Sequence, residues 1–157
     1  MTFDINPKWG SHIDALRAEL GKLSHGALVI EHGAGMYSSV EIARHDVRVI
    51  CAEEALGWQA WTAWVYTGRD ATIVERWKHT VPGLADAALV FIDGRARDRS
   101  KLLGACIERF VPVIILHDTE QSAWHEYGWS SHLLNPSGYD VEHHGDQPRT
   151  TVLRRRG

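Results

Sequence analysis

Five side chains that could bind a ligand or exchange a proton stand directly after short apolar runs of the sequence. They are Glu31, Glu53, Asp93, His117 and Asp118. A carboxylate accepts hydrogen bonds from the hydroxyl groups of a ligand, and a histidine can take up or release a proton near neutral pH. Because the carboxyl ends of parallel strands meet at one edge of a sheet, we expect these five side chains to converge there. This convergence is the main functional signal in the sequence.

A glycine-bearing turn follows the first of these acids. Gly33 and Gly35 carry no Cβ atom, so the backbone can turn sharply there and come close to a ligand. The carboxylate of Glu31 would repel a phosphate group and favours a ligand with a positive charge. Glu53, at the end of the next apolar run, could accept both hydroxyls of a ribose. The pattern indicates a ligand with a ribose and a positive group, although two turn glycines are also compatible with a purely structural role.

Short β-like runs alternate with helical patterns along the chain. Strands are expected at 27–30, 47–52, 71–74, 87–92 and 111–116, and two further runs at 139–143 and 150–153 are expected to pair as a hairpin. Helices are expected at 11–23, around 42–43, at 55–66, at 98–110, and from 119 towards 134. This alternation predicts an α/β fold with a doubly wound, mostly parallel seven-stranded sheet and a C-terminal antiparallel hairpin.

The composition is that of one globular domain. The chain has 157 residues, of which 44% are hydrophobic and 24% charged, and its formal net charge is −3. We expect a single domain over 1–157, with a leading helical segment 1–26, a core 27–153 and a basic tail 154–157. No apolar run reaches the roughly 18 residues that a membrane helix needs, and no signal peptide is visible. The weakly acidic total charge argues against nucleic acid as a partner.

The cysteines and tryptophans add two expectations. Cys51 and Cys106 both lie in apolar runs and predict buried thiols in a reducing compartment, which favours the cytoplasm. Trp58, Trp61 and Trp64 lie on the predicted helix 55–66. Their spacing predicts a helix that packs on the sheet, with Trp64 edging out of the packed face, or one that contacts another subunit, so a homo-oligomer stays open.

At this point the sequence resembles a known family. The run 29–35, VIEHGAG, looks like motif I of the class I S-adenosylmethionine-dependent methyltransferases, in which an acid is followed by Gly-x-Gly. Glu53 matches their ribose-binding acid. The runs 89–94 and 113–119 are similar to the fourth- and fifth-strand motifs of a small-molecule O-methyltransferase-like subgroup. The resemblance extends over nearly the whole chain, from about 28 to 154, and implies the Rossmann-like methyltransferase fold.

The resemblance implies S-adenosylmethionine as the cofactor and a methyl transfer to a small molecule, at oxygen. The cofactor-binding residues that it implies are Glu31, Gly33, Ala34, Gly35, Ser38, Glu53, Glu54, Trp77 and Asp93. The turn residues would line the methionine part, Glu53 would take the ribose, and Glu54 would lie near the adenine. Trp77 could stack on the adenine or simply pack at the edge of the sheet.

The catalytic residues expected from the same resemblance are His117, Asp118 and Asp93. His117 or Asp118 would deprotonate the methyl acceptor. Two structural roles stay open beside this one: His117 could fix the end of its strand by a hydrogen bond, and Asp118 could cap the next helix.

Metal-dependent members of the subgroup hold a divalent cation with acids after the fourth and fifth strands. Asp93 and Asp118 could serve, but no third ligand is evident, and the segment 95–99 places arginines where such a site would want acids. These arginines could form a solvated helix start or bind an anionic methyl acceptor. No metal ligand is therefore assigned; a divalent metal stays open without being favoured.

Two alternatives belong to other functional classes. The first is a non-catalytic protein that keeps the fold and binds a cofactor or a partner. The second, less favoured, is a dinucleotide-binding oxidoreductase: Ser38 stands in place of the third glycine of G-x-G-x-x-G, and Glu31 would face the pyrophosphate site.

Overall fold

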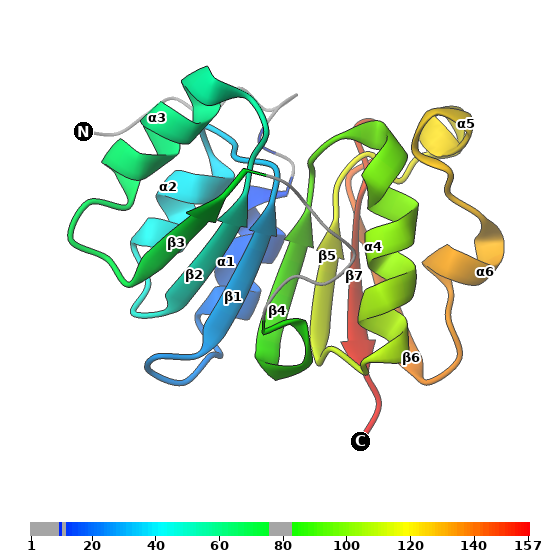
Figure 1. Cartoon of the computed structure of the whole chain (residues 1–157). Coiled ribbons are helices and arrows are strands. Elements are labelled where there is room, and N and C mark those ends of the chain that lie inside the picture. The colour runs from blue at the N-terminus through cyan, green and yellow to red at the C-terminus, as the bar shows by residue number, and fades with distance from the viewer. Residues whose placement is uncertain (1–9, 11, 76–82) are drawn as a thin grey trace.

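A seven-stranded sheet forms the centre of the computed structural model, which describes residues 10, 12–75 and 83–157 (Figure 1). Its strands are β1 (Leu28–His32), β2 (Arg48–Ala52), β3 (Ala71–Val74), β4 (Ala87–Ile92), β5 (Val113–Leu116), β6 (Tyr139–His144) and β7 (Thr150–Arg155). Their order is β3-β2-β1-β4-β5-β7-β6, and β7 is the one strand that runs antiparallel to the other six. The predicted doubly wound sheet with its C-terminal hairpin is confirmed.

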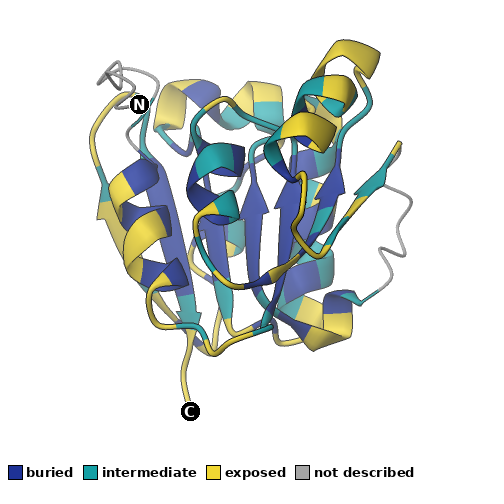
Figure 2. Cartoon of the chain, turned by 90° about the vertical axis from the view of Figure 1, so that its left-hand side faces the viewer, coloured by how far each residue is buried: buried dark blue, intermediate teal, exposed yellow. Residues whose placement is uncertain are grey.

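Helices cover both faces of this sheet. They are α1 (Ile13–Leu20), α2 (Ser38–Ala43), α3 (Leu56–Val65), α4 (Ala96–Glu108), α5 (Trp124–Tyr127) and α6 (Ser131–Leu134), with short 3-10 turns at Leu84–Asp86 and Gln121–Ala123. Side chains alternate along β4: Leu89 and Phe91 pack with α1 and α2, whereas Val90 and Ile92 pack with α4. Figure 2 shows the resulting buried layer along the strands, with the exposed surface on the outer sides of the helices. Period-two alternation with apolar residues on both faces is what a sheet covered on two sides requires.

Three local expectations are wrong. The first strand does not end before Glu31: β1 continues through His32, because that stretch pairs in register with both β2 and β4. The single helix expected from 119 towards 134 is broken into a 3-10 turn, α5 and α6. Gly128, with φ of +68°, ends α5, and the hydroxyl of Ser130 caps α6 by accepting a hydrogen bond from the Leu133 N–H.

The third wrong expectation concerns the tryptophan-rich helix α3. Thr62 is the only fully buried residue of α3, and the side chains of Trp58 and Trp64 are exposed. These aromatic residues are therefore not part of the core, and their role in a subunit contact stays a prediction. In the described part of the chain, no helix combines the length and the apolar character that crossing a membrane would require.

Candidate functional site

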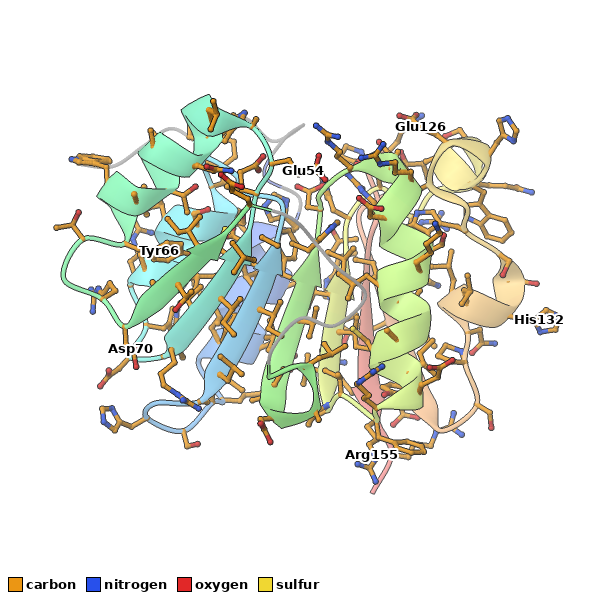
Figure 3. All side chains as sticks on the ribbon, viewed as in Figure 1. Glu54, Tyr66, Asp70, Glu126, His132 and Arg155 are labelled. Atoms are coloured by element: carbon orange, nitrogen blue, oxygen red, sulfur yellow. The ribbon has the colours of Figure 1, made fainter. Side chains whose placement is uncertain are left out.

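The carboxyl ends of β1, β2, β4 and β5 meet at one edge of the sheet, as the sequence predicts. His32 pairs with both Ala52 and Ile92, and Ile92 pairs with Leu116, so the residues that follow these strands become neighbours. Figure 3 shows Glu54 at this edge and Asp70 at the opposite one. The candidate site is built from the loops along the first of these edges.

Glu31 lies inside the protein and braces the turn that follows it. Its carboxylate is fully buried and accepts hydrogen bonds from three hydroxyl groups, those of Ser38, Ser39 and Tyr66, at 2.8–2.9 Å. Burial raises the pKa of Glu31 to about 7, although the three hydroxyls favour its charged form. The hydroxyl of Ser38 is thereby committed to Glu31. The sequence analysis did not identify Ser39 and Tyr66 as partners of Glu31. Ser39 could have been found, because its hydroxyl directly follows that of Ser38 in the sequence.

Packing within the protein requires a glycine at position 33 of the turn. Gly33 has φ of +87°, and a Cβ atom there would lie 2.4 Å from the Cα of Gly94 in the loop after β4. The N–H of Gly33 donates to the carbonyl of Ala52, and that of Ala34 donates to the Glu53 carboxylate at 3.0 Å. The turn is therefore clamped between the ends of β2 and β4.

Replacing Gly33 by alanine should destabilise the protein by at least about 2 kcal/mol. The new Cβ atom would both occupy a left-handed conformation and overlap the backbone of Gly94. Urea unfolding followed by circular dichroism measures the loss. Gly57→Ala is the matched control, because a Cβ atom in α3 at that position meets nothing within 4 Å; it should leave stability within about 1 kcal/mol of the wild type. Equal stability of the two variants would contradict this account of the turn.

A narrow cleft lies between this turn and the start of α4. Its lining residues are His32, Gly33, Ala52, Glu53, Glu54, Gly94, Arg95 and Asp98, and its volume is about 30 Å³. Glu53 accepts hydrogen bonds from the N–H groups of Ala34 and Ala55. Glu54 forms ion pairs with Arg95 and, at 3.8 Å, with Arg97. These pairs join the two sides of the cleft, which has room for about one water molecule. Trp77 lies outside the described residues.

The predicted catalytic residues form one hydrogen-bonded cluster at the ends of β4 and β5. Nδ1 of His117 lies 3.1 Å from Oδ1 of Asp93 and 3.5 Å from Oδ1 of Asp118. Burial alone would lower the pKa of His117, but the hydrogen bond with Asp93 and the charges of both aspartates outweigh it, so the pKa is raised. The pKa of Asp93 is lowered, since the partners His117 and Arg99 outweigh the effect of burial.

Arg99 is the member of this cluster that sequence reasoning did not identify. Its side chain is 6% exposed and binds both aspartates, so the expectation that 95–99 forms a solvated helix start is wrong for this residue. Arg99 faces inward because it shares the buried side of α4 with Leu102, Leu103 and Cys106. The spacing of three, four and seven residues was the signal that could have placed it there.

A second histidine packs against the cluster. The ring of His12 lies edge-on to the ring of His117, with centroids 4.6 Å apart, and also contacts Phe91. Burial, and then the nearby charge of His117, lowers the pKa of His12 to about 4, so this imidazole is neutral at neutral pH. The uncharged ring of His12 therefore forms the side of the site that packs against His117.

The chain after β5 closes over the cluster. The indole N–H of Trp129 donates to the carbonyl of Asp118 at 2.9 Å, and the indole N–H of Trp124 donates to the carbonyl of Thr119 at 3.0 Å. Thr119 does not cap a helix, since its hydroxyl contacts Thr151 and the carbonyl of Arg149. Asp118 itself has φ of +55°, a conformation that is rare for non-glycine residues and occurs often at functional sites.

Comparison with solved structures identifies the architecture. The N-methyltransferase NodS from Bradyrhizobium japonicum aligns with a TM-score of 0.69 and 10% identity, over 99% of each chain. An S-adenosylmethionine-dependent O-methyltransferase from Thermotoga maritima aligns at 0.66 and 13%, over 99% of this chain and 67% of that one. An rRNA methylase from Streptococcus thermophilus aligns at 0.60 and 13%, over 99% and 100%. No protein-family model and no curated protein sequence matches the chain. The chain has the Rossmann-like fold of these methyltransferases.

Proposed function

We propose that this protein is an S-adenosylmethionine-dependent methyltransferase, and that it binds its cofactor where β1, β2 and β4 end. The observation that carries the proposal is the position of Glu53. Its carboxylate stands at the end of β2 and is held by the N–H of Ala34, inside the glycine turn. A carboxylate fixed to this turn is well placed to accept ribose hydroxyls beside a bound cofactor.

The chemistry of the donor set fits this cofactor. Each oxygen of Glu53 uses one lone pair on a backbone N–H and keeps one for a hydroxyl group. Ligand sites usually have volumes of about 300–1,000 Å³, so the cleft of about 30 Å³ must widen. Arg95 and Arg97 are the side chains that must move; both are more than half exposed, so their ion pairs with Glu54 cost little to break.

When bound, S-adenosylmethionine supplies a methyl group on a positively charged sulfur. The protein then has to hold an acceptor in line and remove its proton. His117, whose Nδ1 lies 3.1 Å from Oδ1 of Asp93, is proposed to take up this proton with its imidazole. Asp93 and Asp118 are proposed to orient the ring. We further propose a small-molecule acceptor with a reacting oxygen, supported by the weakly acidic charge of the chain and by the presence of this base. Glu31 and Ser38 are proposed to shape the turn rather than to touch the cofactor.

Thermal unfolding with added ligands tests the proposal. S-adenosylmethionine or S-adenosylhomocysteine at about 100 times Kd should raise Tm by about 5–10 °C, whereas NAD should not. Glu53→Ala should abolish the shift. Glu126→Ala, which removes an exposed carboxylate from α5, should retain it. Equal stabilisation by NAD, or no stabilisation by any of the three ligands in either the wild type or Glu54→Ala, would contradict the proposal.

A non-catalytic protein with the same fold, which binds a partner and not an adenosyl ligand, is the second candidate. The observation that favours it is the narrow cleft, which the Glu54 ion pairs close. This candidate predicts no thermal shift with either adenosyl ligand, even in Glu54→Ala, in which the ion pairs are absent. A shift that appears or grows in Glu54→Ala would instead support an adenosyl-ligand site and show that the ion pairs restrict entry; loss of methyl transfer with retained binding in His117→Ala would then distinguish an enzyme from a non-catalytic binder.

A further inference from the structure

The carboxylates of Asp93 and Asp118 and the imidazole of His117 form the one group of three potential metal ligands found in the described part of the chain. Their ligand atoms all lie within 4.8 Å of one another. Two carboxylates and a histidine at this spacing could in principle hold a divalent cation. Each carboxylate, however, is already engaged with a cation that belongs to the protein.

That cation is the guanidinium of Arg99, and it bridges the two aspartates. Nη2 lies 3.0 Å from Oδ1 of Asp93, and Nη1 lies 3.1 Å from Oδ2 of Asp118. A metal ion between these carboxylates would have to displace the guanidinium or share the space with its positive charge. The described residues therefore do not fit a divalent metal while Arg99 keeps this position.

The surroundings of Arg99 satisfy every donor of its side chain. Nε donates to the carbonyl of Gly94 at 2.7 Å, Nη1 also donates to the carbonyl of His117, and Nη2 also donates to the carbonyl of Asp93. With the two carboxylate bonds, this makes five hydrogen bonds for the five N–H groups of a guanidinium. The ring of Tyr127 covers one face of the group, 4.0 Å from Cζ. Both strand ends and the chain after β5 thus form a closed site for this cation.

We infer that Arg99 is a built-in replacement for a divalent cation: its guanidinium holds Asp93 and Asp118 in the positions that a metal would otherwise set. Asp93 in turn contacts Nδ1 of His117 at 3.1 Å, so Arg99 is a positioning residue for the cluster. The inference rests on the geometry of this cluster and does not depend on the proposed methyl transfer. It predicts that cation binding by the wild type is excluded and that removal of the guanidinium creates a metal site.

Mn²⁺ binding to the purified full-length chain, followed by the electron paramagnetic resonance signal of the free ion, tests this directly. The wild type should show no saturable submillimolar site. Arg99→Ala should bind one Mn²⁺ per chain at least about tenfold more tightly, and the ion should raise its Tm by about 5 °C or more. Both effects should vanish in Arg99→Ala/Asp118→Asn. A wild-type site that is lost on Asp118→Asn, or a folded Arg99→Ala protein without a site, would overturn the inference.

Arg99→Lys keeps the test decisive if the alanine variant does not fold. A lysine preserves the positive charge but not the planar fork of donors. This variant should fold less stably than the wild type and should still bind no Mn²⁺, because an ammonium group remains between the carboxylates. Submillimolar Mn²⁺ binding by Arg99→Lys would show that the charge of residue 99 does not exclude the metal, and would overturn the inference.

Discussion

Arg99→Met is expected to lower the free energy of unfolding by about 3–5 kcal/mol at neutral pH. The substitution takes from Asp93 and Asp118 the guanidinium that bridges them and removes five hydrogen bonds made by a side chain that is 6% exposed. Breaking a largely buried ion pair from one side carries a cost of this size because the two carboxylates stay mostly shielded from water and keep only the contact with His117 against their charge. Methionine keeps much of the volume of the arginine stem, so the loss reports the charge and the hydrogen bonds. Urea denaturation of the two proteins measures it.

Arg97→Met is the matched control for this measurement. Arg97 lies on the same turn of α4, but its side chain is 65% exposed and its ion pairs with Glu54 and Asp98 are 3.8 Å long. Its removal should change the free energy of unfolding by no more than about 0.5 kcal/mol. Similar losses in the two variants would mean that Arg99 is not the buried bridge of the cluster.

Glu31→Gln is expected to change how stability depends on pH. The carboxyl group has an ordinary pKa of 4.5, and burial raises its pKa to about 7 in the folded protein. Between these two values the folded state keeps a proton that the unfolded state releases, so stability falls as pH rises. The wild type should therefore lose about 3 kcal/mol relative to Glu31→Gln as the pH rises from about 4 to about 8, and the difference should stay constant at higher pH.

The comparison must be made as a difference between the two proteins at each pH. His12 has a pKa lowered to about 4, so it makes both proteins more stable as pH rises from 4 to 6.5. This effect cancels in the difference. Glu41→Gln serves as a control of opposite sign: its pKa is lowered, chiefly because the hydrogen bond from Arg17 outweighs burial, so its contribution is lost as the pH falls. A difference for Glu31→Gln that does not vary with pH would contradict the burial of an ionisable group at this position.

The positions of the strands and the edge where the parallel strands end could be predicted from local pattern alone. The apolar runs 71–74 and 87–92 become β3 and β4 without a change of boundary. Runs that are apolar on both faces form buried parallel strands, and right-handed crossovers leave few topologies for five such strands. Glu53, Asp93, His117 and Asp118 were placed at one edge for the same reason, and the structure brings them there.

The partners of these side chains could not be predicted in the same way. Tyr66 reaches Glu31 across 35 positions of sequence, and Arg99 reaches Asp118 across 19. Each contact depends on which face of a helix is turned towards the sheet and on the position of the helix along the sheet. The exposure of Trp58 has the same origin, since α3 buries only Thr62 despite its apolar composition.

The sequence by itself determined the class of fold, the edge of the sheet that carries the candidate site, and the acids and the histidine found there. It could do so because strand periodicity and chain direction are local properties. Only the tertiary structure decided that Gly33 packs against Gly94, that Glu31 is buried beneath three hydroxyls, and that Arg99 fills the space between two aspartates. These outcomes depend on close packing between elements distant in sequence, where a shift of a few ångströms separates an open site from a closed one.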